Sequence, residues 1–231
     1  MIHVLFDVDE TIVTTKSGLN AQASAQMFKK VFNVDTNEET VDNFAKTESW
    51  IIKAVLAKDG VIIDTVPENA YKVWAEETSK LLRHDPPTVL PGIPELLYEL
   101  SRRNNVTLAL LTGNSLQRAD AKIHPTNLCN YFVGPNGHTV NGVFGNMADI
   151  RGDLLIQFKK QVPPDDQIII VDDSLIGAQM ASEQHIPSIL VATGRTPKNI
   201  LKRYSPHVFD DFGENRWKQA VNIIESYQVV K

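Results

Sequence analysis

Three short apolar runs in this chain each end abruptly in acidic or small polar residues, and few folds accommodate that pattern. The runs are residues 4–6, 106–111 and 168–171, and they are followed by Asp7, by Thr112-Gly113-Asn114 and by Asp172-Asp173-Ser174. Apolar runs of this length, without polar alternation, are typical of strands buried on both faces of a parallel sheet. The polar residues after them are then expected at one edge of the sheet, where the strands end.

Segments with helical character separate these runs, so strand and helix alternate along the chain. The expected helices cover residues 93–103, 115–123, 153–162 and 175–185, and apolar runs at 189–192 and 208–209 add two expected strands. This order predicts an α/β fold with a doubly wound, Rossmann-like parallel sheet, in which ligands bind outside the carboxyl ends of the strands. Asn-Gly pairs at residues 136–137 and 141–142 also predict a small hairpin or tight loop.

The stretch between the first and second apolar runs has a different character. It shows no convincing strand and has four amphipathic segments, at residues 21–32, 39–45, 48–57 and 68–82. Helix breakers at Pro86-Pro87 and Pro91-Gly92 mark its end. We therefore expect an α/β core formed by residues 1–13 and 91–231, and an inserted all-helical cap domain formed by residues 14–90.

Composition excludes several classes of protein. The net charge is −5 and there is no basic run, which argues against a nucleic-acid partner. The N-terminus lacks the apolar stretch of a signal peptide because Asp7 interrupts it, and no segment approaches the roughly 18 apolar residues of a membrane span. Cys129 is the single cysteine, which excludes an internal disulfide. We expect a soluble, cytoplasmic protein, monomeric or homodimeric, without nucleic-acid or membrane partners.

Four aspartates stand at the ends of two predicted strands. Asp7 and Asp9 follow the first apolar run at alternate positions, and Asp172 and Asp173 follow the third. Adjacent carboxylates repel one another unless a positive charge lies beside them, and a divalent cation supplies that charge. A lone aspartate at a strand end more often caps a helix or turn, but this set with Thr112 favours a metal. Oxygen ligands suit Mg²⁺, so the sequence predicts a magnesium site at this edge.

These motifs, in this order, resemble those of the haloacid dehalogenase (HAD) superfamily of phosphotransferases. The first motif is Asp7-Val8-Asp9-Glu10-Thr11, the second is Leu111-Thr112-Gly113-Asn114, and the last lies within residues 168–174. The helical insert is similar to the C1 cap of that superfamily, and residues 91–99 and 186–194 are similar to phosphoglycolate-phosphatase-like members. The resemblance spans essentially the whole chain. It implies an Mg²⁺-dependent phosphohydrolase that acts on a small phosphorylated metabolite.

The resemblance also implies roles for the four aspartates. Asp7 is expected to be the nucleophile that forms an aspartyl-phosphate, and Asp9 to act as general acid and then as general base. The Mg²⁺ ion is expected to bind the Asp7 carboxylate, the backbone carbonyl of Asp9 and an acid of the last motif. Asp173 is the expected ligand with Asp172 as helper, and the choice between these two stays open.

The groups that hold the phosphate are implied in the same way. Thr112, with Gly113 and Asn114, is expected to bind the phosphoryl oxygens. The superfamily also has a positive residue before the last motif, and two residues compete for that role here. Arg151 ranks first, since a guanidinium suits phosphate, and Lys122 on the helix after the second motif ranks second. For either residue the alternative is an ordinary surface or helix-end charge.

The cap is expected to set the substrate. Residues 45–48 resemble the loop that reaches into the cleft of related C1-capped phosphatases, so Lys46 is expected as an anion contact and Thr47 as a hydrogen-bond donor. An equal alternative for Thr47 is the N-cap of the following helix. Trp50 and Trp74 are expected in the core of the cap.

Two departures from the superfamily pattern leave other functions open. Glu10 occupies a position usually held by glycine, and Gly177 replaces a second acid. One alternative is therefore a non-catalytic regulatory protein that binds a phosphorylated ligand. A sugar phosphomutase of the same family is another. A dehalogenase is disfavoured, because halide displacement needs no acid such as Asp9.

Overall fold

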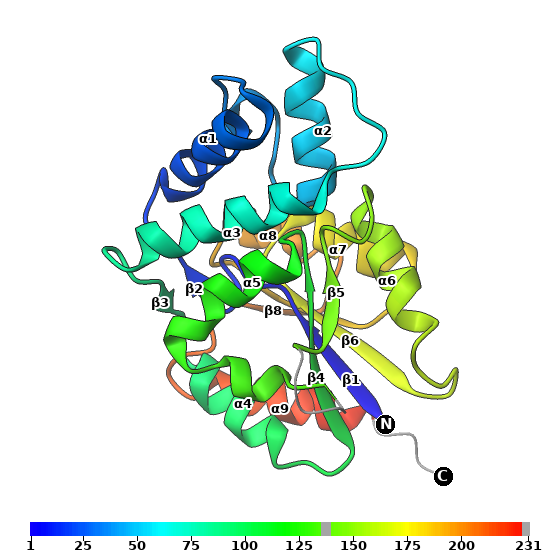
Figure 1. The fold of residues 1–231 in the computed structure, drawn as a ribbon. Helices are drawn as coiled ribbons and strands as arrows, with labels where there is room; N and C mark the ends of the chain where they lie inside the picture. Colours follow the sequence, from blue (N-terminus) through cyan, green and yellow to red (C-terminus); the bar gives the residue numbers. More distant parts are fainter. Residues whose placement is uncertain (135–139, 228–231) are drawn as a thin grey trace.

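A single parallel sheet forms the centre of the molecule in the computed structural model, which describes residues 1–134 and 140–227. Within these residues the strand order is β5-β4-β1-β6-β7-β8, and every neighbouring pair is parallel (Figure 1). The strands are β1 (Ile2–Phe6), β4 (Val106–Thr112), β5 (Gly142–Phe144), β6 (Gln167–Asp172), β7 (Ser188–Val191) and β8 (His207–Phe209). The predicted doubly wound α/β class is confirmed.

Helices cover both faces of this sheet, which explains why the central strands are continuous apolar runs. One face packs against α4 (Ile93–Ser101), α5 (Leu116–Ile123) and α9 (Arg216–Ser226) in one apolar cluster. The other face packs against α6 (Arg151–Lys159) and α7 (Leu175–Glu183) in a second cluster. The short helix α8 (Lys198–Leu201) joins α7 and the edge strands in a smaller cluster.

The chain connections run to opposite sides of β1, which makes the carboxyl end of β1 the topological switch point of the sheet. β4 pairs with one side of β1 and β6 with the other, so that Phe6 lies opposite both Leu110 and Val171. The three strands therefore end at nearly the same level. Their next residues must meet at the carboxyl edge beside β1, where doubly wound sheets bind ligands.

Three further helices lie beyond this edge and pack around an apolar core of their own (Figure 1). They are α1 (Leu19–Phe32), α2 (Glu48–Lys58) and α3 (Glu68–Leu82). Trp74 is fully buried in this core, and Trp50 packs at its border, as expected for both. A separate core supports the proposed cap domain of residues 14–90.

A two-stranded antiparallel ribbon joins the entrance and exit of the helical segment. It consists of β2 (Val13–Thr14) and β3 (Thr88–Val89). The sequence pattern predicts no strand in this segment, and β3 differs from that expectation because a two-residue strand is too short to show periodicity. The ribbon therefore holds side by side the two points at which the chain enters and leaves the helical segment.

Two other local predictions differ from the structure. The helix expected at residues 39–45 is wrong: only a 3-10 turn, η1 (Glu38–Thr40), forms there, and Val41 is already extended. The first Asn-Gly pair of the predicted hairpin, residues 136–137, lies outside the described residues. Val133 and Val140 form an antiparallel bridge. The second pair, residues 141–142, leads into the parallel strand β5. The remaining 3-10 turns are η2 (His124–Thr126) and η3 (Cys129–Phe132).

No helix in the described part of the chain is long and apolar enough to cross a membrane.

Candidate active site

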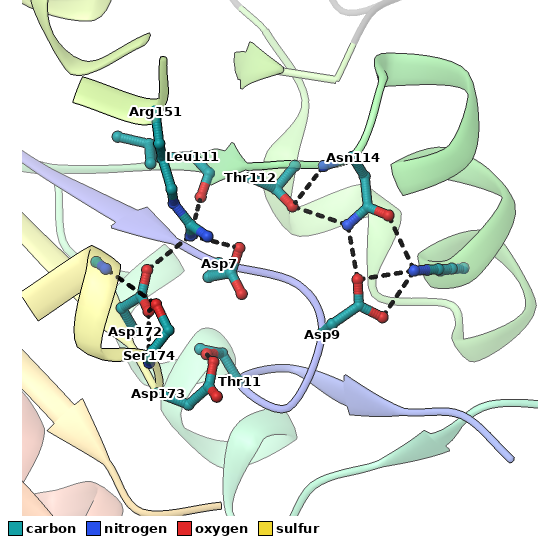
Figure 2. Close-up of polar contacts among 12 residues, drawn as sticks. Asp7, Asp9, Thr11, Leu111, Thr112, Asn114, Arg151, Asp172, Asp173 and Ser174 are labelled. Carbon is teal, nitrogen blue, oxygen red and sulfur yellow. Dashed lines mark hydrogen bonds and ion pairs between the residues drawn. The ribbon is translucent and has the colours of Figure 1, made fainter. Parts of the chain in front are cut away.

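Asp7 leaves the end of β1 and faces a buried arginine. Arg151, the first residue of α6, places Nη2 2.7 Å from Asp7 Oδ1 and 2.7 Å from Asp172 Oδ2. Figure 2 shows the guanidinium reaching between the two carboxylates, and its Nη2 also donates to the carbonyl of Leu111 at 3.4 Å. Arg151 is thus the residue beside the predicted nucleophile. The paired carboxylates in turn raise the already high pKa of Arg151, against the effect of its burial.

The two aspartates after β6 have different surroundings. Asp172 accepts hydrogen bonds from the N–H and the hydroxyl of Ser174 on Oδ1, at 2.8 and 2.6 Å, and from Arg151 on Oδ2. Both of its oxygens are therefore engaged within the protein. Asp173 accepts only one hydrogen bond from the described residues, at 3.2 Å from the hydroxyl of Thr11. Asp173 is consequently the less engaged carboxylate of the pair.

Gly177 is explained by the position of Asp172. A Cβ atom at Gly177 would collide with the carboxylate of Asp172, which folds back over the start of α7. The hydroxyl of Ser174, which holds that carboxylate, also caps α7 by accepting from the N–H of Gly177 at 2.9 Å. The acid that the sequence pattern lacks at residue 177 is therefore excluded by packing.

Three carboxylates are close enough together to hold a metal ion. Asp7, Asp172 and Asp173 each offer one oxygen, and these oxygens all lie within 4.8 Å of one another. Burial, with the repulsion of neighbouring carboxylates, raises the pKa of Asp7 to about 7 despite Arg151, and raises the pKa of Asp173 well above its usual range. The cluster thus has more negative charge than one arginine neutralises. A hard divalent cation with oxygen ligands fits this donor set.

Asp9 lies apart from that cluster and is paired with a buried lysine. The Nζ atom of Lys122 is 2.7 Å from each carboxylate oxygen of Asp9 and 2.9 Å from Oδ1 of Asn114. Asn114 in turn donates to Asp9 Oδ2 at 2.7 Å (Figure 2). Burial acts to raise the pKa of Asp9, but Lys122 and its neighbours hold it below the usual value. Lys122 therefore lies beside the predicted acid and Arg151 beside the predicted nucleophile.

The second motif turns at the end of β4. The hydroxyl oxygen of Thr112 accepts from the backbone N–H and the side-chain amide of Asn114, at 3.2 and 2.9 Å. Gly113 lies directly under the helical segment of residues 14–90, since a Cβ atom there would collide with the carbonyl of Lys46, and its own carbonyl accepts from the N–H of Glu48 at 2.8 Å. Glycine at this position permits the close approach of this segment to the end of β4.

The cap loop places its two predicted residues differently. Lys46 lines the cleft, with its ammonium 5.3 Å from the ring centroid of Trp50. The hydroxyl of Thr47 donates to the carbonyl of Asp149 at 2.8 Å and accepts from the N–H of Trp50 at 3.3 Å. Of the two roles expected for Thr47, this geometry favours the N-cap of α2.

Glu10 adopts the conformation that glycine usually supplies. Its φ is 56°, in the left-handed region, and its carboxylate accepts a hydrogen bond from Thr14 at 2.7 Å. Its carbonyl accepts from the hydroxyl of Thr193, in the loop after β7. The side chain lines the cleft beside the candidate metal cluster.

A buried arginine that the sequence pattern does not reveal joins the sheet domain to the helical segment. Arg118, on α5, donates to Glu48 of the cap at 2.8 Å, lies 4.0 Å from the carboxylate of Glu38 and stacks 4.3 Å from the ring centroid of Trp74. No local pattern predicts these contacts, because the partners are far away along the chain. Arg195, after β7, lies over Phe44 of the helical segment.

One cleft of about 200 Å³ lies between the core and the helical segment and brings these groups together. Its wall includes most of the predicted site residues. They are Asp7, Asp9, Lys46, Thr112, Gly113, Asn114, Arg151 and Asp173. Lys122 and Asp172 lie just behind this wall. Lys122 contacts Asp9 and Asn114 of the wall, and Asp172 contacts Arg151 and Ser174. A space of this size suits a small molecule.

The fold is thus a doubly wound parallel sheet with aspartates at its central switch point, a buried arginine between two of them and a helical segment above. A family model described as haloacid dehalogenase-like hydrolase matches residues 2–184. The chain therefore belongs to the haloacid dehalogenase-like hydrolase family, and the predicted membership is confirmed.

Solved structures of similar fold come from several bacteria. A putative β-phosphoglucomutase from Bacteroides vulgatus is 19% identical, with a TM-score of 0.61 over 98% of this chain and 89% of that chain. A predicted phosphatase from Clostridium acetobutylicum is 17% identical, with a TM-score of 0.60 over 95% and 98%. A mutant of CbbY from Rhodobacter sphaeroides, in complex with xylulose-(1,5)bisphosphate, is 20% identical, with a TM-score of 0.63 over 92% and 95%. No curated protein matches the sequence.

Proposed function

We propose that this protein is a Mg²⁺-dependent phosphohydrolase that cleaves a small phosphate monoester through an aspartyl-phosphate. The observation that supports it most is the separation of two carboxylates with different partners in one cleft. Asp7 lies in the cluster that suits a cation, beside Arg151, whereas Asp9 lies outside that cluster, with Lys122. Such a division suits one carboxylate for attack and the other for proton transfer.

In the first step a carboxylate oxygen of Asp7 attacks phosphorus, and the bond between phosphorus and the ester oxygen breaks. The proton of Asp9, in its acid form, passes to the departing oxygen, so the alcohol leaves neutral. Thr112, whose hydroxyl oxygen already accepts from Asn114, directs its O–H towards a phosphoryl oxygen. Arg151 holds Asp7 in position through the contact to Oδ1.

In the second step a water molecule attacks the phosphorus of the aspartyl-phosphate. Asp9, now a carboxylate, takes the proton of this water, and the bond between phosphorus and the Asp7 oxygen breaks. Inorganic phosphate leaves, and both aspartates return to their starting protonation states. Lys122 and Asn114 keep Asp9 oriented towards the cleft throughout.

We assign the carboxylates of Asp7 and Asp173 and the backbone carbonyl of Asp9 as ligands of Mg²⁺. Asp172 contributes indirectly, since Ser174 and Arg151 already occupy its oxygens. Bound there, the ion would neutralise charge between the nucleophile and the phosphate. The pKa values of Asp7 and Asp173 are raised in the structure. A bound cation would lower both pKa values by stabilising the ionised carboxylates, which is consistent with this assignment.

The test is hydrolysis of p-nitrophenyl phosphate with and without Mg²⁺. We expect turnover that depends on Mg²⁺ and that falls by about a thousandfold or more in Asp7→Asn. Asp165→Asn, an exposed aspartate on the loop before β6, is the matched control and should retain full activity. Turnover by Asp7→Asn at the level of the unmodified protein would exclude the proposed nucleophile.

A further inference from the structure

The part of the cleft formed by the helical segment is lined by hydrogen-bond acceptors. Glu48 begins α2, Glu38 begins η1, and Asn20 lies in the first turn of α1; all three line the cleft. Glu48 is 1% exposed and Glu38 is 7% exposed. Two buried carboxylates are costly unless their charges are paired, and here they share one cation, Arg118.

Two of these acceptor atoms receive no hydrogen bond from the described residues. Glu48 accepts from Arg118 on Oε1, at 2.8 Å, but its Oε2 is buried without a donor. The Oδ1 atom of Asn20 is also buried without a donor. A buried acceptor left unpaired costs about 1–3 kcal/mol. Both side chains line the same cleft, so a ligand there that turns these two oxygens towards its own donor groups would remove this cost.

The charges of this region point in the same direction. Three carboxylates, Asp9, Glu38 and Glu48, face two cations, Arg118 and Lys122, which leaves one negative charge in excess. The part of the cleft around these five residues therefore favours hydroxyl or ammonium groups over a second anion.

We propose that the leaving group of the substrate presents hydrogen-bond donors, either hydroxyl or ammonium, to Glu48 and Asn20. This inference rests on the proposed function, because the donors belong to the alcohol that departs from the phosphate. Glu48 and Asn20 are then specificity-determining residues. The cleft volume of about 200 Å³ limits the leaving group to a few heavy atoms.

Two cations in the cleft could instead favour an anionic leaving group. Lys46 and Arg195 line it and have no carboxylate partner among the described residues; each lies over an aromatic ring, Trp50 for Lys46 and Phe44 for Arg195. If these two cations dominated, the leaving group would be an anion. A substrate series that differs only in the charge and donors of the leaving group separates the two cases.

The experiment compares four esters with two-carbon leaving groups: ethyl phosphate, hydroxyethyl phosphate, aminoethyl phosphate and phosphoglycolate. We expect kcat/KM for the hydroxyethyl or aminoethyl ester to exceed that for ethyl phosphate by about tenfold or more, which corresponds to one well-formed hydrogen bond. Whichever of these two esters has the higher kcat/KM shows whether the preferred donor is a hydroxyl or an ammonium group. Equal values for the first three esters, or a preference for phosphoglycolate, would overturn the inference.

Two variants test the assignment of residues. In Glu48→Gln an amide replaces the unpaired oxygen, so the preference for donors over ethyl phosphate should fall about tenfold. Asn20→Leu removes the other acceptor and leaves the ion pair of Arg118 intact. If Glu48→Gln does not fold, the ester preference of Asn20→Leu tests the assignment. Glu39→Gln, the same change at an exposed neighbour, should retain the preference. An unchanged preference in folded Glu48→Gln and in Asn20→Leu contradicts the assignment.

Failure of the proposed function is distinguishable from failure of this inference. If none of the four esters nor p-nitrophenyl phosphate is hydrolysed with Mg²⁺, the phosphohydrolase proposal fails. The same four esters can then be titrated by calorimetry as ligands of the intact protein. Tighter binding of the hydroxyethyl or aminoethyl ester than of ethyl phosphate would still support the donor preference, and its absence would overturn it.

Discussion

Lys122 directs its ammonium at both carboxylate oxygens of Asp9, at 2.7 Å each, from a position on α5 that is fully buried. Burial and the nearby Arg118 lower the pKa of Lys122, while Asp9 opposes that change. The pair keeps Asp9 ionised in the absence of ligand. Under the proposed function, the negative charge of a bound phosphate ester would then favour the protonated, acid form of Asp9.

Lys122→Met should destabilise the protein, because Asp9 loses its cation and Asn114 loses a donor to Oδ1. Breaking a buried pair costs about 3–5 kcal/mol, and we expect about 2 kcal/mol here because the Asp9 side chain is 33% exposed. Urea denaturation measures this change. The double variant Asp9→Asn with Lys122→Met should recover most of the loss. A single variant as stable as the unmodified protein would show that the pair contributes nothing.

Mg²⁺ should stabilise the protein more at high pH than at low pH. Burial raises the pKa of Asp7 from 3.8 to about 7, so the folded state binds this proton more tightly than the unfolded state. That stabilisation is complete below the unfolded value and is lost as the pH rises through about 7. Since Mg²⁺ binds the ionised carboxylates, the rise in Tm on adding Mg²⁺ should be larger at about pH 8 than at about pH 5.

Thermal unfolding at the two pH values, with Mg²⁺ or with EDTA, tests this prediction. Asp173→Asn removes a proposed ligand and should abolish most of the rise in Tm, whereas Asp165→Asn, an exposed aspartate, should retain it. An equal rise in Tm at both pH values would be inconsistent with the proposed ligands.

Glu10→Gly should be more stable than Glu10→Ala by about 1 kcal/mol, because a left-handed backbone is unfavourable for residues with a Cβ atom. The φ of Glu10 is 56°, and both variants lose its hydrogen bond from Thr14, so their difference isolates the backbone contribution. Chemical denaturation of the two variants measures it. If the two midpoints coincide, the left-handed conformation is not strained.

Gly113→Ala should separate the cap loop from the core. The added methyl group would collide with the carbonyl of Lys46, and the hydrogen bond from Glu48 to the Gly113 carbonyl would be lost. A displacement of about 1 Å lowers kcat/KM by about a hundredfold in such sites. Gly152→Ala is the control, since its methyl group would meet only a flexible side chain at 3.6 Å. Normal activity of Gly113→Ala would mean that close contact is unnecessary.

The strands that carry the aspartates were predictable because their signals are local. Residues 4–6, 106–111 and 168–171 are apolar without alternation and stop at polar residues, which is what burial on both faces of a sheet requires. The elements that were missed have weak local signals. β5 (Gly142–Phe144) and β3 (Thr88–Val89) are short, and residues 39–45 form no helix, because Asn37 caps only a single turn.

Sequence spacing ranked Arg151 ahead of Lys122 for a single position next to the phosphate. In the fold Arg151 contacts Asp7 and Asp172, while Lys122 contacts Asp9, so each cation has its own carboxylate. Spacing along the chain cannot separate these roles, because it does not show which face of a helix points at which strand end.

The class of fold, the aspartates at its switch point and the family can all be inferred from the sequence alone, since these depend on motifs of a few consecutive residues. Which charges pair depends instead on how the folded elements pack together. The contacts of Arg118 with Glu48 and Trp74, and the packing of Gly177 on Asp172, join residues from different elements. Burial then sets their energies, because an ion pair or an unpaired acceptor matters most where water is excluded.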